Sequence, residues 1–503
     1  MRTSMMVTAL AAAGVLSLAG CGGDGEAPAA TTTAAKSGGA PQTALVRTHA
    51  SFAEASVHDP SVILANGQYY VFGSHLAAAK TPDLMHWTKI ADGVTPANPL
   101  IPNAANQLAE ALAWAQTSTL WAPDVIRMDD GRYYMYYNAC KGDSPRSALG
   151  IAVADHVEGP YVNQGIVLKS GMWGEVSPDG TVYDATRHPN VVDPNVFRDN
   201  AGKLWMVYGS YSGGIFILQL DKANGRPLPG QGYGKHLMGG NHSRIEGAYV
   251  LYSPQSKYYY LFTSFGGLDA NGAYNMRVAR SRNPDGPYVD GRGKDMATVK
   301  SDPTKPLFDD ASIAPHGQKL LGNYQFALAA GETGTPLGYV SAGHNSAFYD
   351  AATKQHFLIF HTRFPNTGEM HELRVHEMFV NEEGWPVVAP FRYAPKAKDD
   401  PVSVGAVAAV GTYKFINHGK DITAAIRQSQ IVKLGNDGRI SGDVKGRWTY
   451  RGSDRVSLAL DGTAAPYSGV LSRQWNSNTN GFTITFTAQN ADGVSVWGAR
   501  TGN

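Results

Sequence analysis

The feature that most constrains the fold is an aromatic, strand-like segment that recurs five times along the sequence. Each copy is a short run rich in Tyr, Phe, Val and Met, and most copies end in a small polar residue. The copies are QYYVFGS at 68–74, RYYMYYN at 132–138, KLWMVYGS at 203–210, KYYYLFTS at 257–264 and QHFLIFHT at 355–362. Because aromatic and β-branched residues favour strands, each copy predicts a β-strand.

A shorter apolar segment and a turn precede each aromatic strand. These segments read SVILANG, DVIRMDDG, NVFRDNAGK, AYVLYSPQSK and SAFYDAATK, and their Gly, Asn and Asp residues suit tight hairpins. No sustained amphipathic helical pattern competes over residues 50–393. Regular β units at intervals of about 50–100 residues predict an all-β chain with a five-bladed β-propeller over 51–393. A pair of β-sandwiches is the alternative.

Ionisable residues stand at equivalent positions in four of the five units. When the first strands are aligned on their apolar pair, such as Val62-Ile63, the residue three places earlier can be compared between units. These residues are Asp59, Ala122, Asp193, Glu246 and His344. Since the innermost strand of each blade lines the axis of a propeller, we expect the four ionisable side chains to meet at one end of it.

Three carboxylates around one cavity repel each other, so the arrangement indicates a function. Two carboxyl groups on either side of a sugar can act as acid and base in glycosidic hydrolysis, and a third can raise the pKa of the acid. Apolar neighbours around Glu246 suit a general acid. Taken singly, each residue also has a structural explanation. Asp59 and Asp193 precede proline and could cap turns, Glu246 could be a surface acid, and His344 a core histidine.

Charge and cysteine content exclude other classes. The 503 residues carry 43 Lys+Arg and 42 Asp+Glu, a formal net charge of +1, so no basic field for nucleic acid exists. His344 has no CxxC or HExxH motif near it, which argues against zinc, whereas a hard cation held by water and carboxylate suits the set. Cys140 lies in an apolar run and is expected to be a buried thiol.

The N-terminal residues predict export. Residues 1–20 read as a signal peptide, and Leu18-Ala19-Gly20-Cys21 resembles the lipobox of bacterial lipoproteins. That resemblance implies cleavage before Cys21, lipidation of its thiol, and a membrane-anchored protein at the cell surface or in the periplasm. Residues 21–50 would then be a lipidated cysteine with a flexible tether. A plain secretory signal is the alternative.

The ordered motifs resemble glycoside hydrolase family 43, and within it the two-domain endo-α-1,5-L-arabinanases. The matching segments are His58-Asp59-Pro60-Ser61, Trp121-Ala122-Pro123-Asp124, Asp193-Pro194-Asn195, Ile245-Glu246-Gly247, Gly343-His344-Asn345-Ser346 and residues 371–393. The resemblance implies endo-hydrolysis of arabinan, the side chain of pectin, with inversion at the anomeric carbon. Asp59 would be the general base, Glu246 the general acid, and Asp193 the modulator of the pKa of the acid.

The same resemblance suggests sugar-binding and metal-binding residues. The substrate set is Asp59, Trp121, Asp124, Asn138, Asn190, Val191, Val192, Asp193, Ser210, Tyr211 and Ser212. Trp121 would stack on an arabinose face, with packing between blades as the alternative. In the subgroup that the sequence resembles, the histidine that matches His344 is linked to a metal, usually calcium, in the central channel, so a calcium ion near His344 is expected. The sequence has Val192 where Ile is common and Ser212 where a bulkier aromatic residue often stands, so the subsite at Ser212 is expected to differ.

Residues 394–404 read as a linker, and 405–503 as a second all-β module, sandwich-like or barrel-like. Turns at NDG, GSD, LDG and ADG separate its short strands, and residues 482–499 predict a final hairpin. The module could bind carbohydrate through Trp and Tyr, or it could pack against the propeller.

The sequence is compatible with three hypotheses about function. The first is an endo-arabinanase, which we expect to be a monomer. The second is an exo-acting arabinofuranosidase or β-xylosidase of the same family, since the loops at 97–120 and 140–192 decide whether the cleft is open. The third is a non-catalytic glycan-binding surface lipoprotein. A purely structural propeller would have no need of three axial carboxylates.

Overall fold

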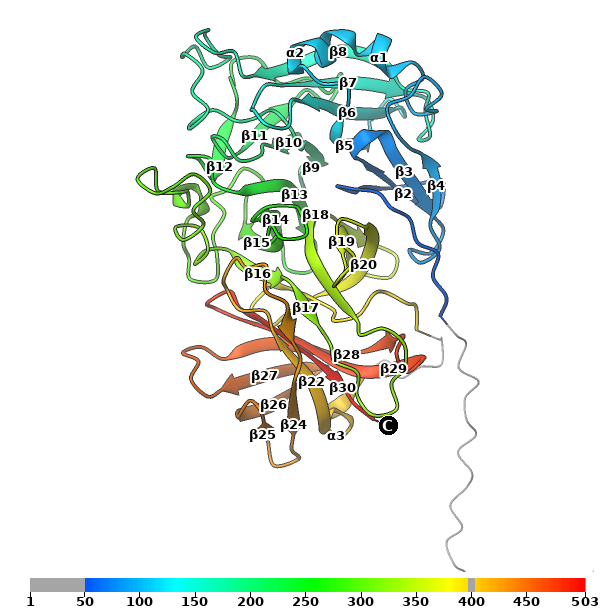
Figure 1. Ribbon diagram of the computed structural model, residues 1–503, viewed down its shortest axis with the longest axis vertical. Coiled ribbons are helices and arrows are strands. Elements are labelled where there is room, and N and C mark those ends of the chain that lie inside the picture. Colours follow the sequence, from blue (N-terminus) through cyan, green and yellow to red (C-terminus); the bar gives the residue numbers. More distant parts are fainter. Residues whose placement is uncertain (1–49, 397–402, 503) are drawn as a thin grey trace, which may run out of the picture. The chain divides into compact units, whose positions relative to one another are not determined.

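Five antiparallel sheets follow one another along the chain and form the blades of a propeller (Figure 1). The computed structural model describes residues 50–396 and 403–502, so the predicted signal peptide, Cys21 and part of the predicted linker lie outside the described residues. Each blade starts with one of the hairpins predicted above. The prediction of an all-β, five-bladed propeller is confirmed.

The strands of each blade run in chain order. Blade I holds β1 (Ser61–Ala65), β2 (Gln68–Gly73), β3 (Ala77–Thr81) and β4 (Thr88–Ala91). Blade II holds β5 (Trp121–Arg127), β6 (Tyr133–Cys140), β7 (Ser147–Ala154) and β8 (Val162–Ser170). Blade III holds β9 (Asn195–Arg198), β10 (Leu204–Tyr208), β11 (Ile215–Leu220) and β12 (Lys235–Met238). Blade IV holds β13 (Ile245–Ser253), β14 (Tyr258–Phe265), β15 (Asn275–Ser281) and β16 (Gln318–Leu321).

Blade V is a larger sheet that receives a strand from the C-terminal part of the chain. Its strands are β18 (Gly338–Asp350), β19 (Gln355–Arg363), β20 (His371–Val380), β21 (Pro386–Val388), β17 (Tyr324–Gln325) and β23 (Arg427–Gln428). The short strand β23 runs parallel to β17 and joins the sheet at its edge.

Burial explains why the aromatic segments form the second strand of each blade. Every residue of β6 is buried, because the strand is covered by a neighbouring blade on each face. A strand buried on both faces reads as a continuous apolar run rather than as an alternation. The turn between β1 and β2 is Asn66-Gly67, whose φ angles of 52° and 74° are those that a tight hairpin requires.

The few helices in the described residues are short. In the segment 97–120, α1 (Ala104–Gln107) and α2 (Ala109–Ala115) pack against blade II through Leu108, Ala111 and Leu112. The others are η1 (Ser74–Leu76), η2 (Met296–Thr298) and α3 (Gly405–Ala409). No helix within residues 50–396 and 403–502 has the length and apolar character needed to cross a bilayer.

The C-terminal module is a closed eight-stranded barrel. Its strands are β22 (Gly411–Asn417), β24 (Gln430–Leu434), β25 (Arg439–Gly442), β26 (Gly446–Gly452), β27 (Arg455–Leu460), β28 (Tyr467–Asn476), β29 (Gly481–Asn490) and β30 (Ser495–Arg500). The predicted turns and the final hairpin β29–β30 are present. A core of its own fills the barrel, and this core includes Phe415, Leu458 and Phe486.

The barrel packs tightly on the propeller. Ile416 and Trp497 of the barrel share an apolar cluster with Phe326 and Phe391. Lys319 of blade IV, 3% exposed, donates hydrogen bonds to the carbonyl oxygens of His418 and Asp421. The module therefore packs against the propeller, which is one of the two roles that the sequence left open for it.

Candidate active site

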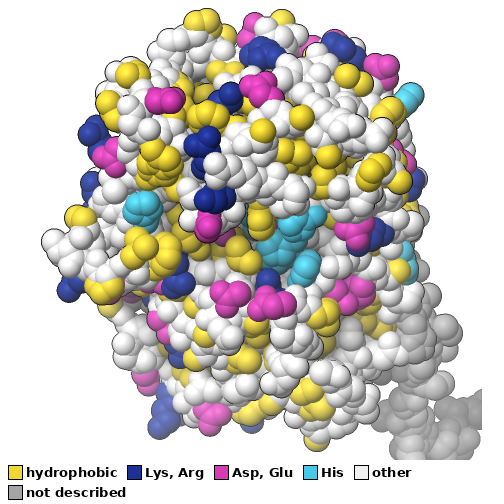
Figure 2. Space-filling model, turned by 45° about the horizontal axis from the view of Figure 1, so that its top comes forward, with side chains coloured by type: hydrophobic (Ala, Val, Ile, Leu, Met, Phe, Trp, Pro, Cys, Tyr) yellow, Lys and Arg dark blue, Asp and Glu magenta, His cyan; other side chains and the backbone are white. Residues whose placement is uncertain are grey.

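A cavity of about 450 Å³ lies at the end of the propeller where the innermost strands begin. Asp59, Asp193, Glu246 and His344 all line it, so the predicted convergence of these four side chains is confirmed. Figure 2 shows a group of histidine side chains near the middle of one face of the molecule, with hydrophobic and acidic side chains beside it.

Unusual backbone geometry presents these side chains to the cavity. Asp59 and Asp193 precede β1 and β9 with φ angles of 56° and 55°, in the left-handed region that is strained for a residue before proline. The register of β13 shifts between Glu246 and Tyr249, and that of β18 shifts on both sides of Gly343. Such bulges redirect side chains beside active sites.

Asp59 is held in its ionised form. Its Oδ2 accepts a hydrogen bond from Ser74 over 2.5 Å and lies 2.8 Å from Nδ1 of His58. Its Oδ1 lies 3.1 Å from Nδ1 of His344. Burial alone would raise the pKa of Asp59, but the charges and hydrogen bonds of His58 and His344 outweigh it and hold the pKa well below its usual range.

The pKa of Glu246 is shifted in the opposite direction from that of Asp59. Burial raises the pKa of Glu246, and its hydrogen bonds only partly offset that effect. Ser210 donates to Oε2 over 2.7 Å, and the Tyr274 hydroxyl donates to Oε1 over 2.8 Å. The cavity therefore holds one ionised carboxylate and one carboxyl group that favours its protonated form.

Asp193 and His344 complete the charge arrangement. Burial raises the pKa of Asp193 to about 7, and repulsion by Glu246 and Asp59 adds to this against the attraction of His344. The backbone N–H of Gly247 donates to Asp193 over 3.4 Å. Burial opposes protonation of His344, yet the charges of Asp59 and Asp193 raise its pKa to about 9. A cationic imidazole thus offsets the carboxylates.

The predicted sugar-binding residues fall into two groups. Those that line the cavity are Asp59, Trp121, Asn190, Val192, Asp193, Ser210, Tyr211 and Ser212. Asp124, Asn138 and Val191 are buried and do not line it. Asp124 accepts hydrogen bonds from Ser61 of blade I and, over 2.5 Å, from the N–H of Val196 in blade III. Asn138 donates to the carbonyl of Ala122. These contacts give Asp124 and Asn138 positioning roles within and between blades.

Several residues of the site escaped the sequence reasoning. His58, Ser74, Tyr274 and His361 surround the carboxyl groups, and Cys140, a buried free thiol as predicted, lines the cavity. Ser74 had a signal, since small polar residues follow the aromatic strands, as does Ser210, which was predicted. Tyr274 had none.

Two exposed apolar side chains from loops of blade IV also line the cavity. Leu268 and Phe308 are 36% and 46% exposed. The ring of Phe308 lies 5.7 Å from that of Tyr211, and its φ is 68°. Arg244 pairs with Asp310 and thereby anchors the loop two residues beyond Phe308. A strained, exposed aromatic residue beside a polar cavity suits contact with a ligand.

A propeller whose axial cleft holds one carboxyl group with a lowered pKa and another with a raised pKa suits a hydrolase of the glycosidase type. Comparison with known proteins gives the family. Residues 50–311 match Glycosyl hydrolases family 43, and residues 390–498 match its C-terminal lipocalin-like domain. The chain belongs to glycosyl hydrolase family 43 and is therefore a glycoside hydrolase, as the motifs predicted.

Similar proteins match nearly the whole described chain. The chain is 57% identical to the extracellular endo-α-(1→5)-L-arabinanase 2 of Bacillus subtilis, over 89% of this chain and 94% of that protein. It is 50% identical to the extracellular endo-α-(1→5)-L-arabinanase of Thermotoga petrophila, over 90% and 94%. A family 43 glycoside hydrolase structure from Bacillus licheniformis superposes with a TM-score of 0.86 at 57% identity, covering 90% of this chain and 99% of that one.

Proposed function

We propose that this protein hydrolyses internal α-1,5-linked L-arabinofuranosyl bonds of arabinan with inversion. The observation that carries the proposal is the opposite shift of two pKa values in one cleft, with that of Asp59 lowered and that of Glu246 raised. The names of the two arabinanases above, which match both the propeller and the barrel, support the substrate and the endo mode.

In the proposed reaction, Asp59 takes a proton from water while that water attacks the anomeric carbon. Glu246 gives its proton to the oxygen of the leaving sugar. Ser210 and Tyr274 fix the carboxyl group of Glu246 through its two oxygens. Asp193 and Glu246 repel each other when both are charged, and this repulsion disfavours ionisation of the two carboxyl groups at once.

The proposal is tested by incubating the protein with linear α-1,5-arabinan while viscosity and product sizes are followed, with Glu246→Ala as the control. A fast fall in viscosity with mixed oligosaccharides, absent in the variant, is the expected result. Release of monosaccharide alone would establish exo action instead. Binding of arabinan without any products would establish a glycan-binding surface protein.

We also propose a calcium ion near His344, and the residues present fit it. Asn345 and Ser346 follow His344 on β18, and among the described residues their buried side chains have no hydrogen-bond partner. Buried polar oxygens of this kind suit a hydrated hard cation. The ion would supply positive charge beside the carboxylates. A chelator should then lower the melting temperature, and added calcium should restore it; an unchanged melting temperature would contradict the proposal.

We further propose that the protein acts as a monomer outside the cytoplasm, anchored through lipidated Cys21. The word "extracellular" in the names of both relatives supports export. If the anchor exists, Cys21→Ser should release the enzyme from the membrane fraction into the soluble fraction. Equal distribution of both forms would favour a plain secretory signal.

A further inference from the structure

A second large cavity opens where blade V meets the C-terminal barrel. Its volume is about 410 Å³, close to the 450 Å³ of the catalytic cleft. Aromatic side chains dominate its wall: Tyr324, Tyr339, Phe364, Phe391 and Trp475. The first four come from the propeller side, and Trp475 comes from β28 of the barrel. The cavity therefore exists only because the two parts of the chain are packed together.

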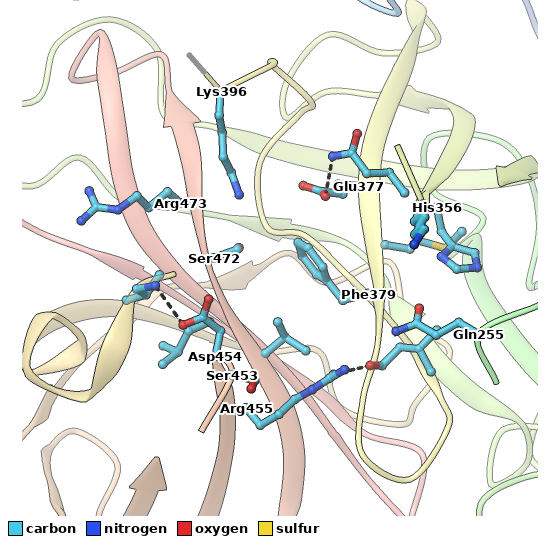
Figure 3. A pocket seen from close by; sticks show the side chains of 17 residues that line it. Gln255, His356, Glu377, Phe379, Lys396, Ser453, Asp454, Arg455, Ser472 and Arg473 are labelled. Atoms are coloured by element: carbon cyan, nitrogen blue, oxygen red, sulfur yellow. Dashed lines mark hydrogen bonds between the residues drawn. The ribbon is translucent and has the colours of Figure 1, made fainter. Parts of the chain in front are cut away.

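A smaller neighbouring cavity shows what an ordinary gap at this junction looks like (Figure 3). Its volume is about 250 Å³, and several polar groups that line it have partners within the protein, although Nε of Arg473 has none among the described residues. Arg455 donates to the carbonyl of Val380, Gln355 donates to Glu377, and Asp454 accepts from the N–H of Val404. This smaller cavity is lined mainly by polar and charged side chains rather than by aromatic rings.

The aromatic cavity differs in the make-up of its wall, which includes an indole N–H that no acceptor in the described part of the chain occupies. Trp475 is 2% exposed, and its indole N–H donates to no other residue among those described. A buried tryptophan usually finds an acceptor for this group. A mostly apolar cavity with a few free polar groups is what a small-molecule site looks like.

The charges around the cavity select a neutral ligand. Arg374 pairs with Glu54 over 3.0 Å and with Glu372 over 2.8 Å. Arg392 pairs with the same Glu54 over 2.7 Å. Because both guanidinium groups are neutralised by the protein, neither is free to attract an acidic sugar or a phosphate.

We propose that this cavity is a second binding site for neutral pentose oligosaccharide, formed jointly by blade V and the barrel. The half-buried ring of Phe364 would pack on the apolar face of a sugar, and Trp475 would donate to a hydroxyl or ring oxygen. This inference rests on the proposed function, because arabinan is the neutral pentose chain that the enzyme would hold there while the cleft cuts it. The barrel would thus help to bind the polymer.

The test is calorimetric titration of the Glu246→Gln variant, which lacks the proposed general acid and so should not cut the ligand, with linear α-1,5-arabinohexaose. Two sites are expected. Phe364→Ala should lose one site and keep the other, and Trp475→Phe, which keeps an aromatic ring of smaller size but removes the N–H, should weaken the same site about fivefold. Leu64→Ala, at a 45% exposed residue that lines neither cavity, is the matched control and should keep both sites. Melting curves of all variants confirm folding.

Each outcome has a distinct meaning. One site in the parent protein, unchanged in Phe364→Ala, would overturn the second site while leaving the catalytic proposal intact. Binding at that site by oligogalacturonate but not by arabinohexaose or xylohexaose would overturn the neutral ligand. Binding of xylohexaose as well would support a site for neutral pentose chains in general. The proposed function is tested separately, by hydrolysis. Failure of the unmodified enzyme to cut arabinan would contradict the proposed function.

Discussion

Ser210 donates a hydrogen bond to Oε2 of Glu246 across the boundary between blades III and IV, over 2.7 Å. Contacts between other neighbouring blades recur around the axis, with a backbone N–H as the donor. Ser74 of blade I accepts from the N–H of Ala122 in blade II, Ser264 of blade IV accepts from the N–H of His344 in blade V, and His361 of blade V accepts from the N–H of Asp59 beside blade I. The end of one blade thus positions the functional residue of the next, so the site depends on closure of the propeller.

Removing the Ser210 hydroxyl should shift the pH profile. Burial raises the pKa of Glu246, while the hydrogen bonds of Ser210 and Tyr274 lower it. Activity falls as pH rises through this pKa, because the acid must be protonated. Ser210→Ala should therefore move the alkaline limb of kcat/KM upward by about one pH unit. Ser472→Ala, a buried serine in the barrel, is the control. A downward shift would contradict the account.

Asp124 should affect stability through pH. Burial raises its pKa from 3.8 to about 6 in the folded protein. The folded state then binds more protons than the unfolded state between these values, so this contribution is present below about pH 4 and is lost as pH rises through about 6. A shift of this size corresponds to about 3 kcal/mol. Subtracting the Asp124→Asn unfolding free energies from those of the unmodified protein should reveal a fall over pH 4–6; a rise there would contradict it.

Phe308 should contribute to substrate binding rather than to stability. Its ring lines the cleft at 46% exposure. Phe308→Ala removes a face for a sugar worth about 1–2 kcal/mol, which should raise KM for arabinan about 5- to 30-fold. The melting temperature should hardly change. An unchanged KM in steady-state assays would show that the substrate does not reach this loop.

A buried ion pair should couple the barrel to the propeller. Lys414 of β22 lies 2.6 Å from Oε2 of Glu332, and the two side chains are 1% and 3% exposed. Glu332→Ala leaves the Lys414 charge buried and should cost about 3–5 kcal/mol in thermal unfolding. Glu332→Leu combined with Lys414→Met should recover most of this loss. A double variant as unstable as the single one would contradict this explanation.

The sequence predicted the blades well because strands buried on both faces must be continuously apolar, as β6 is. The shared register of Asp59, Asp193, Glu246 and His344 then predicted where they meet. Tyr274 and His361 could not be predicted, since only packing between blades brings them to the carboxyl groups. Asp124 does not line the cavity as Trp121 does, because the register of β5 shifts between the two residues and changes the face that each side chain occupies.

The central claim is that Asp59 and Glu246 act as base and acid in a single displacement. The most direct measurement is the anomeric proton spectrum of the first product formed from linear α-1,5-arabino-oligosaccharide, recorded before mutarotation. Inversion predicts that the β-anomer appears first and that Asp59→Asn and Glu246→Gln each slow its formation by about 10²–10⁴-fold. Initial release of the α-anomer would mean retention, which would contradict the assignment of Asp59 as a base.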